Sequence, residues 1–168
     1  LQELDVEEHS SVIQGLLGRI TTCLSAFLPP AVRRDLAPGT ADRLLELARA
    51  AQAGSDKQLQ LVRAVAAHAV TGEQLDVVAG FLEGTSALEG LDVDQDLRWD
   101  LLTGLVAAGR FGEEWIHAEE DRDRTTTGRE RAAESRASIP TPEAKEATWR
   151  ALVDDASMPN ETQVRVLR

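Results

Sequence analysis

Several residue types are scarce in this sequence, and each scarcity excludes a class of protein. Cys23 is the only cysteine, so no disulfide can form within the chain. Aromatic residues make up 4% of the sequence and tyrosine is absent, whereas alanine and leucine are abundant. β-rich domains draw on aromatic and β-branched residues, so this composition favours helices. No apolar run approaches the roughly 18 residues of a membrane-spanning helix, and no signal-peptide pattern opens the sequence.

The charge balance limits the partners that we expect. There are 29 acidic and 18 basic residues, for a formal net charge of −11. The phosphate backbone of nucleic acids and the surface of anionic membranes both require a basic face on the protein. We therefore expect neither a nucleic acid nor a membrane as a partner.

Amphipathic segments separated by caps and breakers predict helices throughout the chain. Breaks are expected at Pro29 and Pro30, at Pro38 and Gly39, and after glycines 54, 84 and 109. Six residue pairs are typical of helix starts: Ser11/Gln14, Ser55/Gln58, Thr71/Gln74, Thr127/Glu130, Thr141/Pro142 and Asn160/Gln163.

The spacing of these starts indicates the fold class. Helix starts recur roughly every 15 to 18 residues, so pairs recur at roughly 30 to 35, the period of helical-hairpin arrays. There is no strand pattern. We predict an all-α fold over residues 1–168, a single repeat domain built as a HEAT-like or armadillo-like stack of antiparallel helical hairpins in a curved superhelix.

Arg98 is conspicuous because it lies in the middle of an apolar helix face. On a helical wheel of residues 92–109 it falls inside an arc formed by Leu97, Trp99, Leu101, Leu102, Leu105, Val106 and Ala108. Burying a guanidinium without a partner would cost several kcal/mol of folding free energy, so Arg98 needs a partner. Asp94, four residues earlier, is one candidate, and Asp94 or Asp96 caps the helix if it begins later.

Two interpretations of Arg98 stay open on the sequence alone. In one, it forms an ion pair that locks its helix to a neighbouring helix. In the other, it lines a cavity and offers its donors to an anionic or carbonyl group of a ligand.

The patterns of common catalytic sites are missing. His9, His68 and His117 are far apart, none begins an H-E-x-x-H, and there is no G-x-S-x-G, Walker or G-x-G-x-x-G motif. The acids at 119–121 are interpreted as a solvated helix face. Cys23 lies in the apolar half of the helix over 11–28, so we expect a buried thiol.

A calcium loop is suggested by the D-x-D-x-D spacing at Asp92, Asp94 and Asp96, but the rest of the motif fails. The sixth position requires glycine and is Leu97, and the twelfth requires glutamate and is Thr103. We therefore predict that this chain has no catalytic residue, no metal site and no cofactor.

Four segments carry a resemblance to a known family. They are GSDKQLQLVRA (54–64), LDVDQDLRWDLLTGLVAAGR (91–110), TGRERAAESRASIPTPEAKEATW (127–149) and MPN (158–160). From about Ser11 onward the chain resembles the C-terminal helical domain of actinobacterial aminopeptidase N, a zinc metallopeptidase of the gluzincin type. The DLRW and TGRERA blocks are specific in combination, although neither is a catalytic signature.

The resemblance implies a HEAT-like bowl, known from endoplasmic-reticulum aminopeptidases too, that caps a thermolysin-like catalytic domain and encloses the peptide-binding cavity. The family's zinc ligands, catalytic glutamate and G-x-M-E-N motif belong to the catalytic domain, and none maps onto this chain. Zn²⁺ is therefore expected in the catalytic domain of the parent. The family's helical domain is longer than 168 residues, so this chain corresponds to a fragment of it.

Our leading hypothesis is a non-catalytic fragment of an enzyme that removes N-terminal residues from peptides, with its own catalytic domain and peptide substrates as partners and a cytoplasmic location. It would wall the peptide chamber and control access to it. Arg98 is the candidate wall residue, with Trp99 as a packing anchor of the wall and Asp94 or Asp96 as orienting or capping groups. The alternative is a HEAT-like scaffold, unrelated to an enzyme, that binds a partner protein along its concave face.

Overall fold

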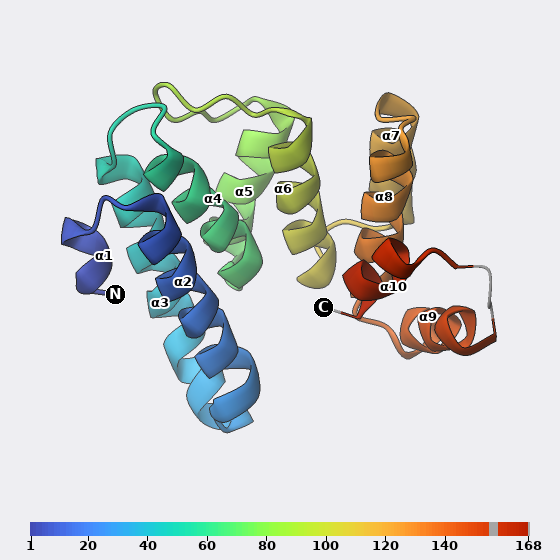
Figure 1. The fold of residues 1–168 in the computed structure, drawn as a ribbon. Coiled ribbons are helices and arrows are strands. Elements are labelled where there is room, and N and C mark those ends of the chain that lie inside the picture. The colour runs from blue at the N-terminus through green and yellow to red at the C-terminus, as the bar shows by residue number, and fades with distance from the viewer. Residues whose placement is uncertain (155–157, 168) are drawn as a thin grey trace. The chain divides into compact units, whose positions relative to one another are not determined.

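The computed structural model describes residues 1–154 and 158–167, and the secondary structure of this part is made of helices joined by loops (Figure 1). No strand occurs within these ranges, which confirms the all-α prediction; the HEAT-like arrangement stays a prediction. The helices form two compact units, Leu1–Asp94 and Gln95–Arg168, and each is described by itself.

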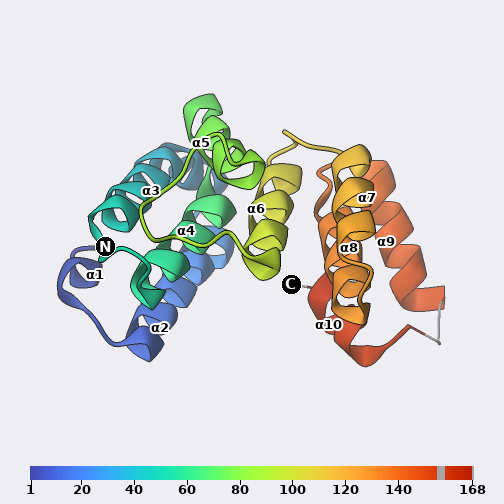
Figure 2. The ribbon, with the colours of Figure 1, turned by 90° about the horizontal axis from the view of Figure 1, so that it is seen from above.

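The first unit is built around two long helices. Its elements are α1 (Glu3–Val6), α2 (Ser10–Thr22), the π-helix η1 (Cys23–Phe27), α3 (Pro30–Ala50), α4 (Asp56–His68) and α5 (Gly72–Glu83). Helices α3 and α4 pack together, and α2 and α5 also contact α4 (Figures 1 and 2). Fully buried aliphatic side chains from α3, α4 and α5 make the core, among them Leu44, Leu61, Val62 and Val78.

The break predicted at Pro38 and Gly39 is wrong, because α3 runs through both residues. A proline inside a helix removes one hydrogen bond and costs about 3 kcal/mol. Packing compensates: the turns that follow bury Ala41, Leu44, Leu45, Leu47 and Ala48. The Pro38 carbonyl also accepts a hydrogen bond from the Gln74 side-chain amide at 2.9 Å.

The prediction that Cys23 is buried is also wrong, since its side chain is exposed. Within α2 only Ile13 is buried, so most of the apolar face predicted there is not covered. From Cys23 the backbone forms a π-helix, whose wider turn moves side chains away from the positions that a 3.6-residue wheel assigns. Phe27, placed on the same face by the wheel, is 75% exposed.

Local capping signals define the next two helix starts as predicted. The Ser55 hydroxyl accepts from the Gln58 amide, and Thr71 with Gln74 forms a complete capping box. Gly84 ends α5 in the left-handed conformation at φ 76°. The capping pair predicted at Ser11 and Gln14 is wrong, because α2 begins at Ser10 and the side chain of its N-cap residue, His9, makes no capping hydrogen bond.

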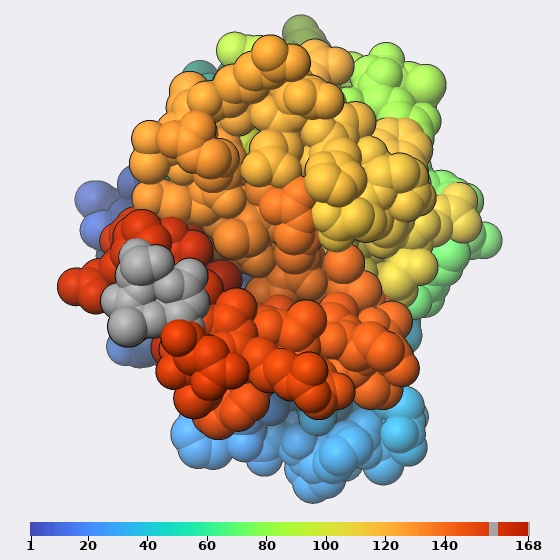
Figure 3. All heavy atoms as spheres, turned by 90° about the vertical axis from the view of Figure 1, so that its right-hand side faces the viewer, coloured from blue at the N-terminus to red at the C-terminus, as the bar shows by residue number. Residues whose placement is uncertain are grey.

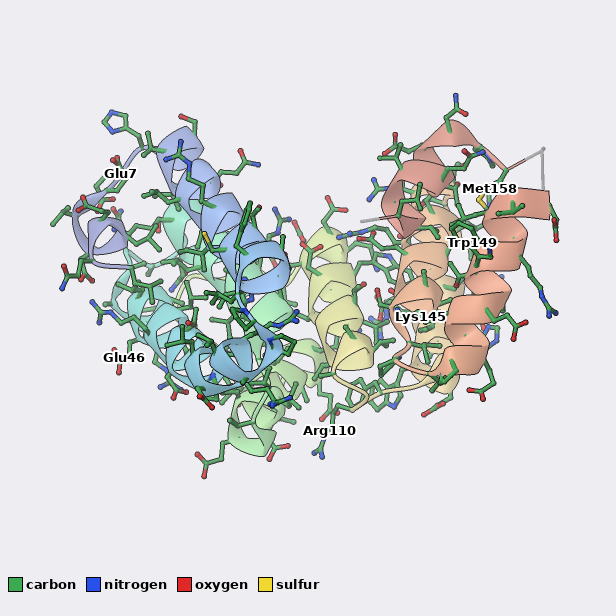
Figure 4. The ribbon with its side chains drawn as sticks, turned by 90° about the horizontal axis from the view of Figure 1, so that it is seen from below. Glu7, Glu46, Arg110, Lys145, Trp149 and Met158 are labelled. Carbon is green, nitrogen blue, oxygen red and sulfur yellow. The ribbon has the colours of Figure 1, made fainter. Side chains whose placement is uncertain are left out.

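The second unit is organised around one helix, α8. Its elements are α6 (Gln95–Ala107), α7 (Glu113–Arg122), α8 (Thr126–Ser138), α9 (Pro142–Asp154) and α10 (Asn160–Val166). Helix α8 contacts all four others, and Figure 3 shows the atoms of α7 to α10 in orange and red. Figure 4 shows Trp149 on the side of α9 toward α10 and near Met158, although Trp149 stays 64% exposed.

At two positions in the second unit the backbone geometry requires glycine. Gly109 has φ +72°, and the Arg110 amide turns back to the Leu105 carbonyl at 2.9 Å, so α6 ends there as predicted. Gly128 lies against Asp123, where an added Cβ would stand 2.0 Å from the Asp123 carbonyl oxygen. Only glycine permits that approach between the start of α8 and the preceding loop.

The start of α8 differs from the prediction by two residues. The N-cap is Thr125, whose hydroxyl accepts from the Gly128 amide at 3.0 Å and donates to Asp123 Oδ1 at 2.7 Å. Thr127, the predicted cap, is an exposed residue inside the helix. Three consecutive threonines offer three possible caps, and the Asp123 carboxylate selects the first. The predicted cap Thr141 lies at the start of α9 and accepts from the Ala144 amide at 3.2 Å. Helix α10 begins at Asn160 as predicted, but its N-cap is Pro159 and no side chain caps it.

This assignment predicts unequal effects for two neighbouring threonines. Thr125→Ala should lower the free energy of unfolding by about 1–2 kcal/mol, because it removes an N-cap and the hydroxyl bound to Asp123. Thr127→Ala, the matched control, should change it by less than about 0.5 kcal/mol. Urea unfolding followed by circular dichroism measures both. Equal losses, or a larger loss for Thr127→Ala, would contradict the assigned cap.

Candidate functional site

Arg98 lies on the buried face of α6 and is paired with a carboxylate from another helix. Its Nε donates to Glu119 Oε1 at 2.8 Å and its Nη2 donates to Glu119 Oε2 at 2.7 Å, so the contact is bidentate. The Arg98 side chain is 20% exposed and that of Glu119 is 6% exposed. The two-pronged geometry fixes both the distance and the orientation between α6 and α7.

Further donors converge on Glu119. Gln95, one turn before Arg98, donates its amide to Glu119 Oε1 at 2.7 Å, and Arg122 Nε lies 3.8 Å from Oε2. Burial raises the pKa of Glu119, but the hydrogen bonds from Arg98 and Gln95 and the nearby positive charges outweigh it. The net pKa lies below the ordinary value of 4.5, so Glu119 is ionised at neutral pH.

Trp99 is a second anchor between α6 and the start of α8. The ring is fully buried, and its indole N–H donates to Asp123 Oδ2 at 2.9 Å. The other oxygen of Asp123 accepts from the Thr125 hydroxyl, and these bonds lower the pKa of Asp123. The polar end of a buried tryptophan is thereby satisfied, and the loop before α8 is held against α6.

Arg131 on α8 joins the DLRW and TGRERA blocks of the sequence. Its guanidinium pairs with Asp100 and Glu134, the latter at 3.1 Å, and donates to the Asp96 carbonyl at 3.2 Å. Within the same two blocks, Leu97 and Ala132 are fully buried. These blocks therefore act through packing and pairing between α6 and α8.

Glu119 is the residue that the sequence interpretation missed. The acidic segment 119–121 was expected to be a solvated face, but Glu119 is 5% exposed and Glu120 pairs with Arg136 at 2.7 Å. The sequence signal was the i, i+3, i+7 spacing of Ile116, Glu119 and Asp123, which puts all three on one helix face. Acidic residues in register with a buried isoleucine indicate a paired interior carboxylate.

The other two predicted site residues, Asp94 and Asp96, are exposed near the start of α6. Asp94 belongs to the first unit, whereas Asp96, Arg98 and Trp99 belong to the second. Nothing in this set has the arrangement of a nucleophile with a base. Among the described residues no group of three or more histidine, cysteine, aspartate or glutamate side chains could hold a metal ion. No helix in the same ranges is long and apolar enough to span a membrane.

The sequence is similar to a known protein family and to a peptidase. The family model described as ERAP1-like C-terminal domain matches residues 1–168. The chain is 40% identical over 167 residues to a protein of Streptomyces lividans named Aminopeptidase N. The match covers 99% of this chain and 20% of the relative, so the chain spans about a fifth of that protein's length.

The Arg98–Glu119 pair predicts a stability difference that depends on pH. Glu119→Gln should lower the free energy of unfolding at pH 7 by about 2 kcal/mol, because it leaves a largely buried guanidinium without its charge partner. The folded pKa of Glu119 is depressed, so its contribution is fully present above 4.5 and is lost as the pH falls through the folded pKa. The difference in free energy of unfolding between wild type and Glu119→Gln should therefore disappear at acidic pH.

Urea unfolding at pH values from 7 downward measures this gap. Glu114→Gln is the matched control, because Glu114 is an exposed carboxylate on the same helix with no ion pair among the described residues. Its free energy of unfolding should stay within about 0.5 kcal/mol of wild type at every pH. A Glu119→Gln gap that stays constant from neutral to acidic pH would show that charge pairing is not its source.

Proposed function

The chain belongs to the ERAP1-like C-terminal domain family, and we propose that it is the non-catalytic helical part of a zinc-dependent aminopeptidase that removes N-terminal residues from peptides. The observation that carries the proposal is the family match along the full 168 residues. The 40% identity to an Aminopeptidase N supports the same assignment. Catalysis would then belong to the four-fifths of such a protein that this chain does not span.

In this proposal the chain acts by enclosure. Zinc and the catalytic glutamate would be held by the partner catalytic domain, and the helical part would close the space in which the peptide lies. A closed chamber excludes bulk water and admits only peptides that can enter and reach the metal, so its walls influence substrate choice. We place this enzyme in the cytoplasm.

The start of α6 is the proposed wall. Asp96 is exposed, and the Arg98 side chain is 20% exposed while it is bound to Glu119. An arginine side chain that keeps part of its surface accessible can contact a peptide carbonyl or carboxylate. Asp94 and Asp96 would orient that arginine or the peptide. Trp99 has no exposed surface, so it would support the wall from behind.

A chimera tests the proposal. The matching fifth of the S. lividans Aminopeptidase N is replaced by this chain, and hydrolysis of leucine naphthylamide is measured with and without a zinc chelator. The unmodified enzyme is the reference. We expect chelator-sensitive turnover by the chimera and none by the 168-residue chain alone. Turnover by the chain alone, or an inactive chimera that is folded, would overturn the proposal.

The wall role of Arg98 is tested in the same chimera. Arg98→Met should raise KM for long peptides about tenfold and leave KM for the short naphthylamide unchanged, because only a long peptide reaches the wall. Arg124→Met is the control, since that side chain is 80% exposed and its ion-pair partner, within the described part of the chain, is Asp121 alone. Lowered thermal stability with unchanged KM for all substrates would show that Arg98 acts only through its ion pair with Glu119.

A further inference from the structure

A cavity of about 610 Å³ lies within the first unit, away from the residues of the candidate site. It is open to solvent on one side and is lined by the end of α2 and the π-helix η1, the first turns of α3, the end of α4 and the connection to α5. Leu24, Ala37, Pro38 and Val70 contribute its apolar lining. A volume of this size is within the range of small-molecule sites, which are apolar cavities with a few polar groups.

Two positive charges at this cavity have no ion-pair partner within residues 1–154 and 158–167. Arg33 and Arg34, adjacent on α3, both line it, and neither pairs with a carboxylate among the described residues. By contrast, Arg131 and Arg136 each pair with two acids. Unpaired guanidinium groups beside an apolar wall are matched by an anion that also carries an apolar body.

His68 adds a polar group to the same wall. Its Nε2 lies 3.0 Å from the Thr21 hydroxyl oxygen, which joins the end of α4 to α2 across the cavity. Burial lowers the pKa of His68, so the ring is neutral at neutral pH. The cavity therefore draws its positive charge from the two arginines, and the imidazole and hydroxyl contribute hydrogen bonding.

We propose that this cavity binds a carboxylate carried on an apolar chain. The carboxylate pairs with Arg33 and Arg34, and the chain fills the space against Leu24, Ala37 and Val70. A fully polar anion would leave the apolar lining unfilled, and a neutral hydrocarbon would leave both guanidinium groups unmatched. Removing the apolar chain from water adds to the affinity that the ion pairs provide. This binding site is separate from the proposed aminopeptidase role and does not rest on it.

Isothermal titration of the 168-residue chain with octanoate tests the proposal. We expect one saturable site, with about tenfold weaker binding of 1-octanol and of inorganic phosphate, because each lacks one of the two features. Arg33→Gln with Arg34→Gln should weaken octanoate binding about tenfold or more. Arg49→Gln is the matched control, because Arg49 is an exposed arginine on the same helix that does not line the cavity. The affinity of Arg49→Gln for octanoate should stay within about twofold of the wild-type affinity.

A cavity-filling variant tests the apolar half of the site. Ala67 is exposed at the cavity, so Ala67→Trp should block octanoate with little effect on the fold, which circular dichroism verifies. The absence of octanoate binding would overturn the proposal. Equal affinity for octanoate and octanol, or phosphate binding as tight as octanoate binding, would also overturn it. The same is true if Arg49→Gln loses as much affinity for octanoate as the double variant.

Discussion

The second unit depends on the neutralisation of one buried charge. Arg98 lies among leucines that are fully buried, and placing a guanidinium there without a partner would cost several kcal/mol, on the order of a small domain's whole stability. The partner, Glu119, comes from α7, so α6 can hold its arginine only when α7 is docked with Glu119 against it. Local helix formation and the packing of two helices are thereby coupled.

The same coupling recurs between α6 and α8. Trp99 is tied to Asp123, and Arg131 is tied to Asp100 and to the Asp96 carbonyl, so the three helices share polar contacts around an apolar interior. This explains why the DLRW and TGRERA blocks are distinctive although they carry no catalytic pattern. They specify how the helices of this unit fit together, which agrees with an ERAP1-like C-terminal domain whose chemistry is proposed to lie elsewhere.

The sequence predicted features that depend on neighbouring residues and missed those that depend on distant ones. The caps at Ser55, Thr71 and Thr141 and the stop at Gly109 follow from local hydrogen bonding and backbone conformation, and they were predicted. The helix through Pro38 was missed because its stability comes from packing on α4. That Arg98 needed a partner followed from periodicity, but the identity of Glu119, 21 positions away, did not. The predicted single domain, its HEAT-like curvature and the wall role of Arg98 stay predictions.

The most direct test of this account is a double-mutant cycle on Arg98 and Glu119. The free energy of unfolding in urea at pH 7 is measured for wild type, Arg98→Met, Glu119→Met and the double variant. The account predicts a coupling energy of about 2 kcal/mol or more, with the double variant more stable than either single variant because no charge is left buried alone. A coupling energy near zero, with additive losses, would show that the pair does not hold α7 against α6.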